Sequence, residues 1–338
     1  MTADVRELRV AAVQMESENG AVEANLERAT PFADEAAGKG AKLVIFPEFM
    51  PTGYIFTREI WDGAEPSDGP TMVWLAENSK RLDIYLGTSF LEAQGGDFFN
   101  TFVITGPDGE VAGRVRKQKP AAAEAYFFRG EKGSHVIETE IGTIGVGICY
   151  ENQLAFTPGL MYGHSADIVL MPHSAPAPTP AWWLHRKRSQ AIADILRKLP
   201  VYYANVLGVP VVLINKTGPF TSPVPGMPFY PQNSRFPGES TIADSDGSIL
   251  ERLGAEEGIA VADVHLEEAL KARSAPPRYG RWSMEIPVEI YAFITAEAAG
   301  RASYSLSSER KKKAREISSP AGRRGNQTQG QSPAVTRP

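Results

Sequence analysis

Short strand-like runs alternate with longer helical segments along most of this chain of 338 residues. Apolar stretches such as LRVAAVQM, KLVIFPE and ADIVLMP are separated by segments of helical character. The turns PDGE and DSDG each lie between two extended runs and predict hairpins. This order predicts an α/β fold with mixed sheets covered by helices. One helix, expected around residues 21–38, contains Pro31, which either breaks it or starts a second helix after Thr30.

The chain divides into three parts by composition. Residues 1–265 contain no internal repeat and no Pro/Gly linker wide enough to split them, so we expect one large domain. Residues 266–305 form an extension whose RYGRWSMEIPVEIYAF stretch has aromatics that can pack on the domain or on a second subunit. Residues 306–338 have few apolar residues and much Ser, Gly, Gln and Pro, and we expect a disordered tail.

The charge is unevenly distributed. The whole chain has a net charge of −5, but residues 306–338 have eight Lys or Arg and two acids, which leaves −11 for the rest. An acidic body is a poor candidate for nucleic-acid binding by general attraction. The RKKKAR run in the tail can touch an anionic surface or nucleic acid, but a solvated charged segment is the simpler interpretation.

The N-terminus has no basic-then-apolar order of a secretory signal, and no stretch approaches the roughly 20 apolar residues of a membrane span. The single cysteine excludes an internal disulfide. We therefore expect a soluble cytoplasmic protein with no membrane or nucleic-acid partner.

Three polar residues stand at the ends of apolar strands: Glu48, Lys117 and Cys149. Sites in open α/β sheets gather at the carboxyl ends of strands. Each residue alone also has an ordinary structural interpretation, as a solvated loop acid, a surface charge and a buried core thiol.

The three motifs around these residues occur in a specific order. LVIFPEFMPTGY, RKQKP and GVGICYEN together resemble the carbon-nitrogen hydrolase (nitrilase) superfamily, and the resemblance continues through the flanks over roughly residues 7–265. The resemblance implies a four-layer αββα sandwich. It also implies homo-oligomers, with no indication of the number of subunits.

The resemblance implies a catalytic triad of Glu48, Lys117 and Cys149. Lys119 is two residues on and shares the strand face of Lys117, so it is the alternative. Lys117 is preferred because Arg116-Lys117 followed by Pro120 matches the RK-x-x-P pattern of the family. A second glutamate usually follows this lysine, and Glu124 is the candidate, although an exposed loop acid is the alternative.

The chemistry implied is acyl transfer through a cysteine. A free thiol is only a small fraction thiolate at neutral pH, so Glu48 would act as its base. The ammonium of Lys117 and the backbone N–H of Tyr150 would bind the oxyanion. No step calls for a metal or an organic cofactor, and the sequence has no HExxH, CxxC or phosphate-binding glycine loop.

The residues after the cysteine bear on the substrate. Family members that cleave N-carbamoyl amino acids often have arginines three and four residues after it, and Asn152 and Gln153 stand here instead, which disfavours such substrates. Tyr150-Glu151 resembles the aromatic-Glu pair of nitrilases and keeps a nitrile substrate open. The expected pocket residues, each with a core or interface role as the alternative, are Tyr54, His173 and Trp182 or Trp183.

The predicted function is that of a thiol hydrolase that cleaves the carbon–nitrogen bond of a small non-peptide amide. The alternative within the same fold is a nitrilase, which converts a nitrile to a carboxylic acid and ammonia. The alternative outside catalysis is a binding scaffold that keeps the fold without the reaction.

Overall fold

Two six-stranded sheets make up the main part of the molecule. The computed structural model describes residues 6–177, 186–224, 227–266, 270–272, 275–276 and 287–319. The first sheet has the order β14-β1-β2-β3-β4-β5. Its strands are β1 (Arg6–Gln14), β2 (Leu43–Ile45), β3 (Tyr85–Gln94), β4 (Asp97–Thr105), β5 (Val111–Arg116) and β14 (Gly258–Leu266).

The second sheet has the order β13-β12-β9-β8-β7-β6. Its strands are β6 (Val136–Thr139), β7 (Gly142–Val146), β8 (Ile168–Pro172), β9 (Val211–Ile214), β12 (Thr241–Ala243) and β13 (Ile249–Arg252). Each sheet has a parallel centre and antiparallel edges, and the predicted hairpins join β4 to β5 and β12 to β13. The sheets are therefore mixed, as expected.

The strands are buried on both faces. Along β1, Leu8, Val10 and Ala12 pack in the core between the two sheets, while Ala11 and Val13 pack against helices. Successive side chains of a strand point to opposite faces, so a strand covered on both sides has a continuous apolar sequence.

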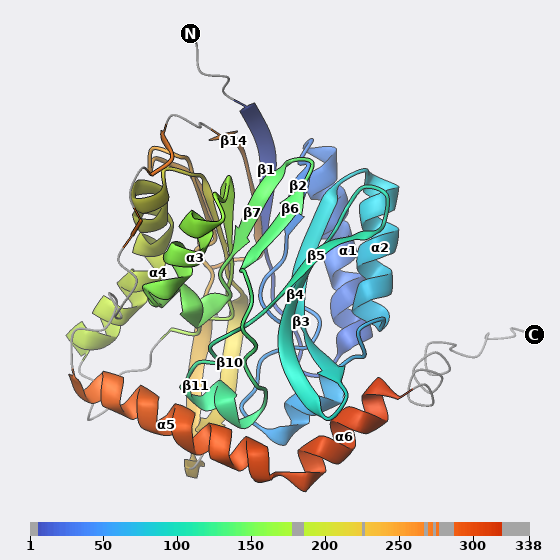
Figure 1. Cartoon of the computed structure of the whole chain (residues 1–338), viewed down its shortest axis with the longest axis vertical. Coiled ribbons are helices and arrows are strands. Elements are labelled where there is room, and N and C mark those ends of the chain that lie inside the picture. Colours follow the sequence, from blue (N-terminus) through green and yellow to red (C-terminus); the bar gives the residue numbers. More distant parts are fainter. Residues whose placement is uncertain are drawn as a thin grey trace, which may run out of the picture.

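Helices cover the outer face of each sheet. On the right in Figure 1, α1 (Val22–Gly38) and α2 (Pro70–Leu82) cover the first sheet. On the left, α3 (Phe156–Gly163) and α4 (Arg186–Leu207) cover the second. The predicted four-layer αββα sandwich is confirmed.

Pro31 lies inside a single continuous helix, so neither a break nor a second helix occurs there. Its ring removes a backbone donor that would otherwise bond to the carbonyl of Glu27. Pro31 and Glu27 are both on the exposed side of α1, where water can take the place of that donor. The hydroxyl of Thr30 donates to the carbonyl of Leu26 at 3.1 Å one position earlier.

The C-terminal segment forms two helices, α5 (Pro287–Leu306) and α6 (Ser308–Ser318), that run across the lower end of the sandwich in Figure 1. The expectation of a disordered tail from residue 306 does not hold for residues 308–318. The hydroxyl of Ser307 caps α6 by accepting from the backbone N–H of Arg310 at 3.2 Å. Arg310 and Ala314 are buried against β3 and β4, which holds a helix with few apolar residues in place. Residues 320–338 lie outside the described residues.

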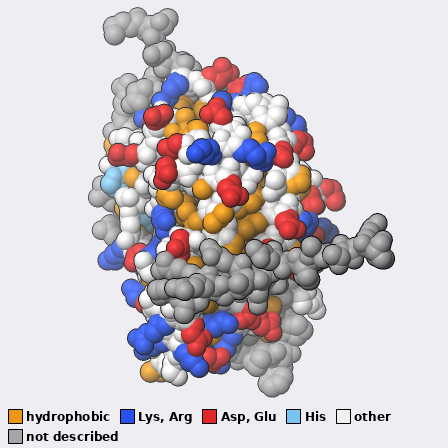
Figure 2. Space-filling model, turned by 90° about the vertical axis from the view of Figure 1, so that its right-hand side faces the viewer, with side chains coloured by type: hydrophobic (Ala, Val, Ile, Leu, Met, Phe, Trp, Pro, Cys, Tyr) orange, Lys and Arg blue, Asp and Glu red, His pale blue; other side chains and the backbone are white. Residues whose placement is uncertain are grey.

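The exposed side of α6 is held by charge pairs to the short 3-10 helix η1 (Arg58–Gly63). Arg58 pairs with Glu309, and Lys313 Nζ lies 2.9 Å from Asp62 Oδ1. On the face drawn in Figure 2, basic and acidic side chains are interspersed, most densely at its lower end. None of the helices in the described ranges combines the length and the apolar character that a membrane crossing requires.

Candidate active site

The three predicted catalytic residues follow three different strands. Glu48 comes three residues after β2, and Lys117 directly follows β5. Cys149 begins the 3-10 helix η3 (Cys149–Gln153), just after β7 of the other sheet. Because the two sheets face each other across the apolar core, loops from both can meet at one end of it.

The ammonium of Lys117 is the centre of the site. Its Nζ lies 2.8 Å from Glu48 Oε1 and 2.8 Å from Glu124 Oε2. Lys117 and Glu48 are fully buried, and Glu124 is 1% exposed. The structure therefore brings the predicted lysine together with both predicted glutamates.

Burial lowers the pKa of Lys117, but the carboxylates of Glu124 and Glu48 more than offset this, and the pKa lies well above its usual value. Burial raises the pKa of Glu124, with Lys117 acting in the opposite direction. The lysine is thus a fixed positive charge between two carboxyl groups, which is what an oxyanion site needs.

Two residues without a motif orient the carboxylate of Glu48. Asn100, on β4, donates its amide to Glu48 Oε1 at 2.7 Å. Ser174, after β8, donates its backbone N–H to Glu48 Oε2 at 2.8 Å and its hydroxyl to the Glu48 carbonyl at 2.6 Å. Neither residue could be predicted from the sequence, because a lone Asn in a strand or a Ser in a loop gives no signal of its own.

Cys149 lies within the electrostatic field of Glu48, Lys117 and Glu124, and is 7% exposed. Burial raises the pKa of its thiol well above the usual value, Glu48 adds to this, and Lys117 opposes it. The backbone N–H of Ser174 faces both this sulfur and Glu48. The resting nucleophile is therefore a thiol that needs a base at the moment of attack.

Three residues in or beside the site have a strained backbone. Phe49, Ala122 and Cys149 have φ angles of 51°, 34° and 54°. A non-glycine residue in this region costs on the order of 1–3 kcal/mol, so surrounding contacts must hold it there. For Phe49, the Ser89 hydroxyl accepts from its N–H at 2.9 Å, and the buried Lys216 donates to its carbonyl at 2.8 Å.

Glu151 joins the cysteine turn to the lysine loop. Its Oε1 accepts from the backbone N–H groups of Gln118 at 2.7 Å and Lys119 at 3.0 Å. Its Oε2 accepts from the N–H of Ile148 at 3.3 Å. The sequence indicates this residue only as half of an aromatic-Glu pair, whereas its carboxylate links the two segments that carry Lys117 and Cys149.

The two candidate lysines are clearly different in the structure. Lys117 is buried and paired with two carboxylates, whereas Lys119 is partly exposed and lines an outer cavity. Lys119 contributes its backbone to Glu151 but has no side-chain ion pair among the described residues.

The predicted pocket residues have different surroundings. The Tyr54 hydroxyl donates to Glu124 Oε1 at 2.7 Å, and its ring packs on Phe49 and Phe220. Tyr150 is buried in η3 directly after Cys149. Trp182 and Trp183 lie outside the described residues.

His173 is 1% exposed at the end of β8. Burial lowers its pKa to about 3, with a further contribution from Lys117, so the ring is neutral. The Asn152 amide lies 3.1 Å from Nε2 and also donates to the Gly147 carbonyl at 2.7 Å, which makes Nε2 the acceptor and leaves the proton on Nδ1. That Nδ1 has no partner in the described part of the chain. In the same ranges, no group of three His, Cys, Asp or Glu is placed to hold a metal ion.

A model of the family described as carbon-nitrogen hydrolase matches residues 9–274. The chain belongs to this family. The resemblance stated from the three motifs is confirmed, and the protein is an enzyme of the family rather than a binding scaffold.

Individual relatives show the range of the family. The chain is 28% identical over 273 residues to Omega-amidase NIT2 of Danio rerio, covering 75% of this chain and 87% of that protein. It is 30% identical over 185 residues to Nitrilase 3 of Arabidopsis thaliana, covering 49% of this chain and 54% of that protein. The fold is similar to a carbon-nitrogen hydrolase of Helicobacter pylori G27, with a TM-score of 0.65 at 19% identity over 77% of this chain and 90% of the other.

Proposed function

We propose that the protein is a thiol hydrolase that cleaves the carbon–nitrogen bond of a small amide through a cysteine acyl-enzyme. The observation that supports this most directly is the buried contact of Lys117 with Glu48 and Glu124, next to the thiol of Cys149. A buried lysine between two carboxyl groups is seldom more stable than apolar packing of the same volume, so this cluster beside a thiol favours a catalytic role over a structural one.

In the first half of the reaction, Cys149 Sγ attacks the amide carbonyl carbon while Glu48 takes the thiol proton. The carbonyl oxygen becomes an oxyanion, stabilised by the Lys117 ammonium and the backbone N–H of Tyr150. Because the pKa of the resting thiol is raised, proton transfer to Glu48 and bond formation occur together.

Glu48 then returns the proton to the leaving nitrogen, the carbon–nitrogen bond breaks, and ammonia or an amine departs. A water enters, gives a proton to Glu48, and attacks the thioester carbon. The carbon–sulfur bond then breaks, the carboxylic acid leaves, and Glu48 returns the proton to sulfur. Asn100 and Ser174 keep both oxygens of Glu48 in a fixed orientation through these reversals.

Glu124 is proposed as a positioning residue. Its carboxylate contacts Lys117, the hydroxyl of Tyr54 and the backbone N–H of Ala121, the last at 2.6 Å. With these contacts it fixes the ammonium and balances its charge. His173 is proposed to bind substrate, because its buried Nδ1–H has no partner among the described residues and can donate to a substrate oxygen.

An amide is proposed because the omega-amidase of Danio rerio is matched over 87% of its length and 75% of this chain, whereas the nitrilase of Pyrococcus abyssi is matched over 74% of its length and 55% of this chain. We further propose a homo-oligomeric cytoplasmic enzyme without a metal, with the C-terminal extension as the candidate interface.

The test is ammonia release from matched pairs of amides and nitriles of the same side chain. We expect turnover of the amides, and turnover confined to the nitriles would assign the alternative reaction. Intact-mass measurement during turnover is expected to show an acyl adduct on the wild type and none on Cys149→Ala. An adduct on another residue would refute the assigned nucleophile.

A further inference from the structure

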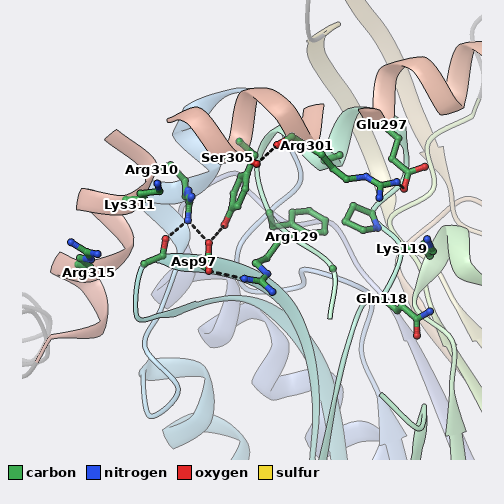
Figure 3. Close-up of a pocket in the computed structure, with 16 residues that line it drawn as sticks. Asp97, Gln118, Lys119, Arg129, Glu297, Arg301, Ser305, Arg310, Lys311 and Arg315 are labelled. Carbon is green, nitrogen blue, oxygen red and sulfur yellow. Dashed lines mark hydrogen bonds and ion pairs between the residues drawn. The ribbon is translucent and has the colours of Figure 1, made fainter. Parts of the chain in front are cut away.

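A cavity apart from the Cys149 site lies between the C-terminal helices and the loop that follows Lys117. Its volume is about 600 Å³, within the range of small-molecule sites. One wall is the segment from Gln118 to Pro120 with Arg129, and the other consists of α5 and α6 (Figure 3). Neither Cys149 nor Glu48 lines it.

The lining of this cavity is strongly basic, although the chain as a whole has a net charge of −5. Two acids and six basic residues line it: Asp97, Glu297, Lys119, Arg129, Arg301, Arg310, Lys311 and Arg315. Like charges at close range repel one another, so such a cluster is unfavourable unless something balances it.

The two acids are already engaged. Arg129 and Arg310 share Asp97, the former at 3.0 Å, and Arg301 pairs with Glu297. Figure 3 shows Asp97 between the two arginines that contact it. The acids of the lining therefore leave its other cations unbalanced.

Lys119, Lys311 and Arg315 have no ion-pair partner among the residues that the structure describes. These three come from both walls, since Lys119 is on the loop and the other two are on α6.

Arg310 is a buried cation of the lining, and the described residues leave one of its hydrogen-bond donors unused. Its side chain is 4% exposed, its guanidinium stacks 4.1 Å from the Tyr304 ring centroid, and Nη1 contacts Asp97 and the Gly96 carbonyl. Its Nε is buried and has no hydrogen-bond partner within the described ranges. Buried donors are nearly always bonded to protein, water or ligand.

We propose that this cavity binds a compact multivalent oxyanion, held between Lys119 on the loop and the basic residues of α5 and α6. Arginine forks fit carboxylate and phosphate groups with two parallel hydrogen bonds, so a polyphosphate or a polycarboxylate shares the required chemistry. The site goes beyond the proposed amide hydrolysis and does not depend on it.

The bound anion would contact the same loop that carries the catalytic lysine. Gln118 and Lys119 are held by Glu151 through their backbone, and α5 packs closely on the 3-10 helix η2 (Ala122–Tyr126), where a Cβ on Gly300 would come within 2.9 Å of Ala125. An occupant therefore adds a connection between the C-terminal helices and the loop.

The test is isothermal titration calorimetry of the full chain with pyrophosphate and with citrate, at constant ionic strength, and with acetate as the monovalent control. We expect one pyrophosphate or citrate per chain and no measurable binding of acetate. Pyrophosphate alone would indicate a phosphorylated ligand, and citrate alone a polycarboxylate, both within the proposal. Failure of both anions to bind would overturn it.

Variants locate the site. Lys119→Gln, Lys311→Gln and Arg315→Gln are each expected to weaken binding by about fivefold or more, because each removes a charge-assisted contact. Lys312→Gln is the matched control, since Lys312 is 79% exposed on the same helix and does not line the cavity. If Lys312→Gln weakens binding as much as the others, the anion is bound by general surface charge and the proposal is wrong. Because binding is read without turnover, this outcome is independent of the amidase assay.

Discussion

The ammonium of Lys216 donates a 2.8 Å hydrogen bond to the carbonyl of Phe49, the strained residue that follows Glu48. Lys216 is 1% exposed and forms no ion pair with a described residue. A second buried lysine therefore supports the turn that carries the proposed general base. The protonation state of Lys216 therefore makes the stability of this turn depend on pH.

Burial lowers the pKa of Lys216 to about 7, with Glu48 acting in the opposite direction. The unfolded chain keeps the proton up to a pKa of about 10.4. Between these values the unfolded state binds more protons than the folded state, so this lysine makes the free energy of unfolding rise with pH, by at most about 1.4 kcal/mol per pH unit.

Replacing Lys216 by Met removes this contribution, and the Phe49 carbonyl keeps its bond from the Gly53 N–H at 3.0 Å. We expect the free energy of unfolding of the wild type, relative to that of Lys216→Met, to rise from pH 7 to pH 9. Urea unfolding of both proteins at each pH measures this difference. Lys80→Met, on the exposed side of α2, is the control and should give a difference independent of pH. The same pH-independent result for Lys216→Met would contradict the assignment.

The two lysines of RKQK provide a matched pair for the active site. Lys117→Met removes the buried ammonium and is expected to lower kcat by about 10²–10³-fold, the usual cost of an oxyanion donor. Lys119→Met removes a partly exposed charge two residues away and should change kcat less than about threefold. Steady-state ammonia release measures both, with circular dichroism to check folding. Equal losses for the two variants would show that the loop, and not the Lys117 ammonium, is what matters.

Glu151 is predicted to matter more for stability than for chemistry. Glu151→Ala leaves the backbone N–H groups of Gln118, Lys119 and Ile148 without their buried acceptor. An unsatisfied buried donor costs about 1–3 kcal/mol. Because the Gln118 and Lys119 groups are only partly buried, we expect a total loss of about 2 kcal/mol in urea unfolding.

Glu151→Gln keeps one oxygen acceptor and should recover part of that loss. Glu138→Ala, exposed on β6, is the control and should cost less than about 0.5 kcal/mol. A Glu151→Ala variant as stable as this control would mean that the carboxylate does not hold the two segments together.

The alternation of apolar strands and helical segments predicts mixed sheets covered by helices. The four-layer sandwich and the site residues within the motifs are what the family resemblance of those motifs implies. Glu48 and Lys117 could be found in this way. Asn100 and Ser174 could not, since their contacts with Glu48 depend on how β4 and the end of β8 approach β2.

Helix α6 was missed for the same kind of reason. Its composition is that of a solvated segment. Arg310 is held by Gly96 and Asp97, which are more than 200 positions away in the chain. Burial of one arginine by distant partners leaves no local pattern in the sequence.

The anchoring of α6 gives the last prediction. Arg310→Met removes the buried guanidinium from Asp97 and from the Gly96 carbonyl, and it removes the stacking on Tyr304. Asp97 keeps Arg129 at 3.0 Å, so its charge is not left alone. We therefore expect a loss of about 2–3 kcal/mol in unfolding free energy, below the full cost of breaking a buried pair. Lys312→Met, at a side chain 79% exposed on the same helix, should leave the free energy of unfolding unchanged.

Limited proteolysis should cut Arg310→Met first within residues 306–319, because the helix loses its main contact with β4. Wild-type protection of this segment in Arg310→Met would show that Ala314 and the surface pairs of α6 suffice to hold it.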